Sequence, residues 1–346
     1  MRVDEAKAIA RRWVLTEAVH LPGFYGAFYH GSTGWLADGA ELPAASDLDI
    51  MVALANPNPP VKPGKFIYQG VLLEVSYLAQ AELQSPEVIL GLSHLAGSFR
   101  TASIIADPTG QLTSLQARVA QDYAKRRWVH ARCEHAQSKI LDGLGRSREV
   151  EQLPDRVIAW LFPTGVTTHI LLLAGLQNPT VRKRYLAVRE LLADYGQPAI
   201  YEPLLALLGC ADWDRAQVER HLMMMTAVFD VARTVVRSPF PFASDLTDQA
   251  RPIAIEGSRE LIEHGDHREA VFWIAATYSR CLQVFAKDAP AALTEQFRDG
   301  YQRLIDDLGV GSSGDLLRRG EAVKAFLPEV WAVAETIMAA NSAIED

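Results

Sequence analysis

The sequence predicts an α+β protein in which a small mixed β-sheet with flanking helices is followed by an all-helical region. Up to about residue 110, apolar residues occur in short runs rich in β-branched and aromatic side chains and separated by turn residues, as in strands. After Gly110, apolar residues recur at spacings of three and four, which is typical of helices that bury one face. The 346 residues suffice for two domains, and we expect one at 1–110 and a second at 111–346.

The first domain contains five predicted strands. Two of them flank Gly70, and their β-branched and aromatic content predicts a hairpin that turns there. The last strand is closed by Asp107–Gly110, where Pro and Gly favour a turn. Val3–His20 and Pro86–Ala96 have helical spacing, and we expect both to cover one face of the sheet. The predicted strands are Phe24–His30, Asp47–Leu54, Lys65–Gln69, Val71–Leu78 and Ala102–Ala106.

The second domain is expected to contain helices alone, because no strand-like alternation stands out in it. Asn178-Pro179 and Ser238-Pro239 are among the breaks between its apolar patterns. The first pattern, Gln111–Leu144, has one expected break. The later ones are Asp155–Leu176, Thr180–Tyr195, Ala199–Leu208, Asp214–Val236, Gly257–Ala286, Ala291–Leu308 and Gly314–Asn341.

The charge of the chain disfavours one class of partner. Lys and Arg number 34 against 42 Asp and Glu, a net charge of −8. A protein that binds nucleic acid independently of sequence needs a basic surface, so we do not expect nucleic acid as a partner. A phosphate ligand is still compatible with this charge, because a bound metal ion brings positive charge of its own.

The N-terminus and the cysteines predict a cytoplasmic protein with no membrane contact. The three cysteines are far apart and form no CxxC unit, so we expect free, buried thiols. Residues 1–15 alternate charged and apolar side chains and lack the apolar core of a signal peptide. The most apolar stretch, Val166–Leu176, is shorter than the roughly 18 residues that span a bilayer.

A glycine and a serine follow the first predicted strand. The strand ends at His30, and Gly31 and Ser32 form a turn that can open a helix. Because Gly31 has no side chain, backbone N–H groups at such a turn can approach a phosphate closely, and the serine hydroxyl adds a donor. This turn is therefore a candidate phosphate-binding segment.

Two aspartates begin the next predicted strand. Because side chains alternate along a strand, Asp47 and Asp49 should share one face, with Leu48 and Ile50 on the other. Two carboxylates this close repel each other unless a cation lies between them. Mg²⁺ is the ion we expect, since it prefers oxygen ligands and keeps coordination sites open for phosphates.

A third carboxylate lies within an otherwise apolar predicted strand. Glu74 interrupts the run Val71–Leu78, where an unpaired charge would be costly to desolvate. A metal site shared with Asp47 and Asp49 would compensate this charge. Two alternatives are a carboxyl group whose pKa is raised so that it serves as a base, and a residue at the sheet edge that faces solvent.

These motifs together resemble the nucleotidyltransferases of the DNA polymerase β superfamily. The resemblance rests on a strand that ends in Gly-Ser, an Asp-x-Asp strand and a carboxylate on a later strand. Leu73–Ser76 is similar to a strand of the streptomycin/spectinomycin adenylyltransferase branch, in which a helical domain follows the catalytic domain. The segment Thr33–Ser46 is slightly longer than is usual in the family.

The resemblance implies a role for each motif. Gly31 and Ser32 would hold the triphosphate. Asp47 and Asp49 would bind one or two Mg²⁺ ions, and Glu74 would complete the metal site or act as general base. The implied reaction transfers a nucleotidyl group, AMP from ATP, to an acceptor hydroxyl and releases pyrophosphate. The helical domain would close the substrate cleft.

A basic run in the second domain is a further candidate. Lys183 and Arg184 stand at the start of a predicted helix. They could contact the triphosphate, as residues of helical domains in this family sometimes do. A solvated helix start explains the same residues equally well.

The acceptor is expected to be a small hydroxylated molecule. The most specific candidate that the resemblance implies is an aminoglycoside. Residues 1–110 have a net charge of −4, about twice the net negative charge per residue of the remaining chain, which suits a cationic substrate or a metal. Two alternatives remain open. One is a catalytically inactive nucleotide- or partner-binding protein with the same fold, and the other is an enzyme that transfers AMP to a protein.

Overall fold

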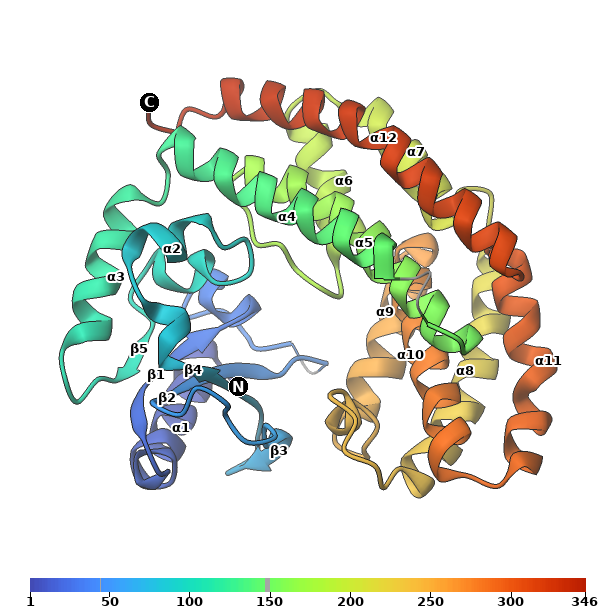
Figure 1. The fold of residues 1–346 in the computed structure, drawn as a ribbon, viewed down its shortest axis with the longest axis horizontal. Coiled ribbons are helices and arrows are strands. Elements are labelled where there is room, and N and C mark those ends of the chain that lie inside the picture. Colours follow the sequence, from blue (N-terminus) through green and yellow to red (C-terminus); the bar gives the residue numbers. More distant parts are fainter. Residues whose placement is uncertain (44, 147–149) are drawn as a thin grey trace. The chain divides into compact units, whose positions relative to one another are not determined.

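The computed structural model describes residues 1–43, 45–146 and 150–346 (Figure 1). Within these residues the protein is mixed α+β, with a five-stranded sheet and a large helical region, as the sequence predicts. The chain divides into two compact units. The first comprises Met1–Arg132, Pro239–Ala250 and Ala343–Asp346, and the second comprises Cys133–Ser238 and Arg251–Ser342.

The sheet belongs to the first unit, and its strands follow the predicted ones closely. The strand order is β3-β4-β2-β1-β5, in which β2 and β4 pair in parallel and all other neighbours are antiparallel. The parallel pair at the centre brings the beginnings of β2 and β4 side by side. The strands are β1 Phe24–His30, β2 Leu48–Leu54, β3 Gly64–Tyr68, β4 Val71–Ala79 and β5 Ile104–Ala106.

The predicted hairpin joins β3 to β4 through a two-residue turn. Gln69 and Gly70 have φ angles of 48° and 83°, the conformation that a tight turn between twisted antiparallel strands requires. Because the turn has two residues, the register places Lys65 directly opposite Glu74. The turn thus brings a basic side chain beside an acidic one.

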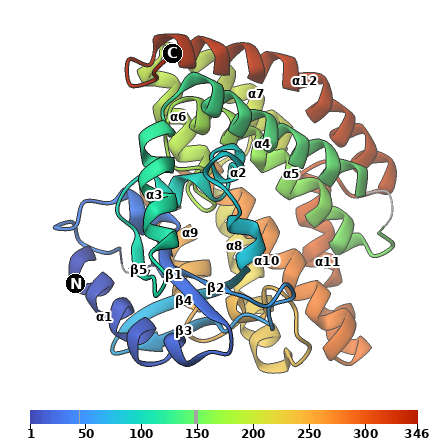
Figure 2. The same ribbon diagram turned by 60° about the vertical axis from the view of Figure 1, so that its left-hand side comes forward.

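Helices cover both faces of the sheet, which corrects the expectation that α1 and α2 share one face. Helix α1 (Val3–Thr16) packs on the face that carries Ile50. Helices α2 (Pro86–Gly91) and α3 (Gln111–Asp122) pack on the face that carries Ala53 (Figures 1 and 2). The strands have apolar residues on both faces, so each face needs a covering helix to exclude water.

The first unit extends beyond residue 110, because α3 packs on its sheet and two later segments join it. Near the C-terminus, Glu345 forms a β-bridge with Lys125, and its carbonyl accepts a hydrogen bond from the Arg126 N–H at 2.7 Å. In the segment Pro239–Ala250, Ser244 lies against Gly64 at the start of β3. A boundary predicted from local patterns could not include segments that return to the unit from so far along the chain.

The second unit is built from helices, whose bounds are close to those of the predicted segments. The segment predicted at 257–286 forms two helices, because the chain turns at Gly265, where φ is 90°. Helix α4 begins in the first unit and continues into the second. The helices are α4 Arg126–Arg146, α5 Leu153–Ala174, α6 Arg184–Asp194, α7 Tyr201–Leu208, α8 Arg215–Val235, α9 Gly257–Glu263, α10 His267–Asp288, α11 Ala291–Asp307 and α12 Ser313–Ala340.

Helix α5 is long and apolar enough to cross a membrane by length and composition, which the shorter stretch at 166–176 did not indicate. It has 22 residues, and 72% of its most apolar 18-residue window is buried within the protein. It packs against α10 and α12 in the second unit. Such burial is typical of the core helix of a helical domain.

Candidate active site

Three carboxylates meet near the beginnings of β2 and β4. Asp47 directly precedes β2, Asp49 lies on β2, and Glu74 on β4 is the parallel neighbour of Asp49. Each offers one oxygen, and these oxygens all lie within 4.8 Å of one another. Leu48 and Ile50 are buried on the opposite face, as the alternation of side chains predicts.

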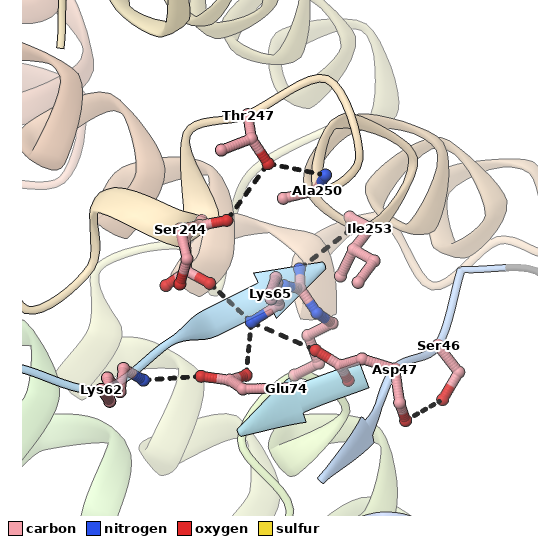
Figure 3. A network of polar contacts seen from close by, with 11 residues as sticks. Ser46, Asp47, Lys62, Lys65, Glu74, Ser244, Thr247, Ala250 and Ile253 are labelled. Atoms are coloured by element: carbon pink, nitrogen blue, oxygen red, sulfur yellow. Dashed lines mark hydrogen bonds and ion pairs between the residues drawn. The ribbon is translucent and has the colours of Figure 1, made fainter. Parts of the chain in front are cut away.

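A lysine that the sequence motifs did not indicate lies among these carboxylates (Figure 3). Lys65 Nζ is 3.1 Å from Asp47 Oδ2, donates to Glu74 Oε2, and donates to Asp245 Oδ1 at 2.6 Å. The Lys65 side chain is 4% exposed. An ammonium group has three N–H donors, and here each has a different carboxylate within reach.

A second lysine and a fourth carboxylate complete this network. Lys62 Nζ donates to Glu74 Oε1 at 2.7 Å, so both oxygens of Glu74 accept from ammonium groups. Lys62 is at the rim, with 32% of its side chain exposed. Asp245 ends the short 3₁₀ turn η6 (Ala243–Asp245), 180 residues after Lys65 in the chain. The network therefore joins β2, β3 and β4 to the segment 239–250.

The two lysines leave the carboxylates with different pKa values: that of Asp49 is raised and that of Glu74 is lowered. Burial raises the pKa of Asp49 well above its usual range, and the neighbouring Asp47 and Glu74 raise it further. Burial alone would also raise the pKa of Glu74, but Lys65 and Lys62 together lower it. Burial alone would lower the pKa of Lys65, but Asp245, Asp47 and Glu74 together raise it. Asp49 is thus the carboxylate of the group whose charge is least compensated.

The Gly31–Ser32 turn lies beside Asp49. Gly31 has a φ of 65°, and a Cβ atom at this position would collide with the Asp49 carboxylate. Two independent constraints therefore require glycine here. The helix expected after the turn is only the 3₁₀ turn η2 (Ser32–Trp35), so this segment lacks the macrodipole of a regular helix, and its backbone N–H groups are the donors that remain.

His30, the last residue of β1, is packed and neutral. Its Nδ1 atom and Ser98 Oγ are hydrogen-bonded at 2.6 Å. Burial, with a smaller contribution from His94, lowers the pKa of His30 to about 4. The imidazole therefore supplies no positive charge to the glycine turn at neutral pH.

The two basic candidates of the second unit differ in exposure. Lys183 is exposed immediately before α6. Arg184 is 1% exposed, its guanidinium carbon lies 4.0 Å from the ring centroid of Phe272, and its Nε donates to the Val181 carbonyl at 2.8 Å. These contacts make Arg184 part of the core of its unit and argue against its expected role in nucleotide binding.

The donor set of the acidic group fits a hard divalent cation. Among the described residues, Asp47, Asp49 and Glu74 form the one group of three or more His, Cys, Asp or Glu with ligand atoms this close. All donors are carboxylate oxygens, which suit Mg²⁺. Within the residues that the structure describes, Asp49 has no ion pair; burial and its two acidic neighbours raise its pKa, and a divalent cation would oppose this shift by stabilising the ionised form.

The sequence carried a signal for Lys65 but none for Asp245. A two-residue turn at Gln69-Gly70, applied to the predicted hairpin, places Lys65 opposite Glu74. No local pattern connects Asp245 with β3, because only the folded chain brings the segment 239–250 to that strand.

Comparisons with known proteins return no relative for this chain: no family model matches it, and no curated protein matches it. The resemblance to nucleotidyltransferases therefore rests on the motifs. The geometry of the residues in these motifs is the basis for a proposed function.

Proposed function

We propose that the protein is a Mg²⁺-dependent nucleotidyltransferase that transfers AMP from ATP to a hydroxyl group of a small molecule. The observation that carries the proposal is the meeting of Asp47, Asp49 and Glu74 beside the Gly31 turn. A glycine turn that can admit phosphates, next to carboxylates that can hold a cation, is the arrangement that in-line phosphoryl chemistry needs.

In this proposal Asp47, Asp49 and Glu74 hold the ion. When bound, Mg²⁺ would neutralise the charge of the triphosphate and of the leaving pyrophosphate. Both oxygens of Glu74 already accept from lysines, and its lowered pKa makes it a weak proton acceptor. We therefore assign Glu74 to the cation site, and not to the role of general base.

The Gly31–Ser32 turn would receive the phosphates. Because Gly31 has no side chain, the Asp49 carboxylate lies close to its backbone, where a Cβ atom would collide with it. Ser32 is half-buried at the start of η2 and would add a hydroxyl donor. Phosphate oxygens would thus meet N–H and O–H donors on one side and the cation on the other.

The acceptor proposed is a hydroxylated small molecule with positive charge, of the aminoglycoside type. The support is the net charge of −4 in residues 1–110. An acidic surface raises the local concentration of a cationic substrate and lowers that of a nucleic acid.

The test is pyrophosphate release from each of the four ribonucleoside triphosphates in the presence of Mg²⁺ and a panel of hydroxylated acceptors that includes aminoglycosides. We expect release that depends on ATP, on Mg²⁺ and on one acceptor. Asp49→Asn should reduce the rate by more than about 1,000-fold, since it removes a carboxylate that holds the cation, while its far-UV circular dichroism stays that of the wild type.

Other results would redirect the proposal. Triphosphate binding without release, across all acceptors, would favour the catalytically inactive nucleotide-binding protein. Labelled AMP found on a protein would favour a protein-modifying enzyme. If Asp49→Asn released pyrophosphate at the rate of the wild type, the assignment of Asp49 to the active site would be wrong.

A further inference from the structure

The position of Lys65 distinguishes this acidic group from a simple cluster of metal ligands. Its Nζ atom lies 3.1 Å from Asp47, 2.6 Å from Asp245 and in contact with Glu74. Two of these three carboxylates are proposed metal ligands. An ammonium group therefore already lies where a cation would bridge Asp47 and Glu74.

We propose that the ammonium group of Lys65 takes the place of a second metal ion, so that the site holds one divalent cation. The inference rests on the proposed function, because it concerns the same carboxylates. Two-metal sites place two ions about 3.5–4 Å apart on shared carboxylates. A second ion that bridges Asp47 and Glu74 would need the place that the Lys65 ammonium group occupies.

The charges of the network agree with one ion. Lys65 places a positive charge in contact with Asp47 and Glu74, two of the proposed metal ligands. The ammonium group would repel a second divalent cation between these two carboxylates, and the substitution Lys65→Met removes this repulsion.

Asp245 holds Lys65 in this place. It accepts from Lys65 Nζ at 2.6 Å, and it belongs to a segment that packs on β3. Asp245 is not one of the three residues whose oxygens converge within 4.8 Å, and it contacts Lys65. We assign Lys65 and Asp245 as positioning residues of the cation site.

The experiment counts Mn²⁺ ions bound by the whole chain after removal of metals with a chelator, from the electron paramagnetic resonance signal of free Mn²⁺. The probe is Mn²⁺ alone, without nucleotide. We expect one ion per wild-type chain, two per Lys65→Met chain and none per Asp49→Asn chain. Lys62→Met is the matched control: it removes the same charge at the rim but does not vacate the bridging place, and it should bind one ion.

The ion counts test the role of Lys65 and the proposed function separately. Two ions on the wild type, or one ion on a Lys65→Met chain whose circular dichroism is that of the wild type, would overturn the role of Lys65 and leave the proposed function standing. No ion on the wild type would overturn the proposed function itself. If Lys65→Met does not fold, the wild-type count still decides between one ion and two.

Discussion

Two buried basic side chains, Lys65 and Arg184, belong to different units, and their surroundings are opposite. Lys65 in the first unit is 4% exposed and has carboxylates around its ammonium group. Arg184 in the second unit is 1% exposed, lies over the Phe272 ring and donates to a backbone carbonyl. Its Nη1 atom is buried without a hydrogen-bond partner.

The two arrangements stabilise a buried cation in different ways. Aromatic faces and carbonyl groups stabilise a buried cation within a packed core, where nothing needs to be exchanged. Several carboxylates around one lysine repel one another, and the group retains an excess of negative charge that a further cation can balance. The surroundings of Arg184 therefore suit a packed core, whereas the carboxylates around Lys65 suit a site that binds a further cation.

Replacement of both cations by methionine gives the largest expected contrast. Lys65→Met leaves three partly buried carboxylates without their shared partner and should lower the free energy of unfolding by about 3 kcal/mol in the absence of divalent ions. Mg²⁺ should restore much of this loss, because the vacated place can hold an ion. Urea unfolding with and without Mg²⁺ measures both effects.

Arg184→Met is the counterpart in the second unit. It removes an unpaired donor together with a cation–π contact, and these opposed effects should leave a loss below about 2 kcal/mol. Mg²⁺ should not change the free energy of unfolding that Arg184→Met loses. Equal restoration of both variants by Mg²⁺ would contradict the distinction between the two regions.

Two glycines with positive φ sharpen the comparison within the first unit. Gly31→Ala and Gly70→Ala should each lose about 1 kcal/mol of stability, because alanine is strained at positive φ. Only the Gly31 Cβ would meet the Asp49 carboxylate, whereas a Cβ at Gly70 would contact nothing within 4 Å. Gly31→Ala should therefore weaken Mn²⁺ binding at least about tenfold, roughly 1.4 kcal/mol, and Gly70→Ala should leave it unchanged.

The Mn²⁺ titration measures this difference directly. Equal affinities of the two variants would show that the Gly31 turn does not support the carboxylates.

A buried histidine of the second unit should give an effect on stability that depends on pH. Burial lowers the pKa of His169 to about 3, and Arg184 contributes to this shift. Since the ordinary pKa is about 6.5, His169 takes up a proton more readily in the unfolded chain. Its contribution to stability is complete above pH 6.5 and is lost as the pH falls toward 3, by at most about 1.4 kcal/mol per pH unit.

Urea unfolding of His169→Gln between pH 7 and pH 4 tests this expectation. The variant should lose less stability on acidification than the wild type. His264→Gln, at an exposed position, is the control and should follow the wild type. If His169→Gln lost as much stability on acidification as the wild type, another group would be responsible for the acid dependence.

The local patterns predicted much of the fold, because each depends on residues close in the sequence. The aromatic run of β1 was predicted with its observed bounds, Phe24–His30. The alternation around Asp49 put Leu48 and Ile50 into the core, as observed. Periodicity also indicated the helices of the second unit, and only the turn at Gly265 divided one predicted segment into two helices.

Properties that depend on distant packing could not be predicted in this way. Periodicity shows that α1 and α2 each have an apolar face, but it does not show which face of the sheet each covers. Composition marks Arg184 as basic, whereas its burial depends on Phe272, which lies on another helix. The limits of the first unit depend on two segments that return to it late in the chain.

By itself, the sequence determined that carboxylates share one face of a strand next to a glycine turn, because side-chain alternation is a local property of extended backbone. The parallel pairing of β2 with β4 then decided that Glu74 lies beside Asp49. The two-residue turn at Gln69-Gly70 placed Lys65 opposite Glu74, again through local geometry. Only the tertiary structure decided that Asp245 joins them, because an ion pair across 180 residues forms when packing brings its partners together. Local patterns therefore indicated the candidate ligands and the position of Lys65, and they did not indicate Asp245.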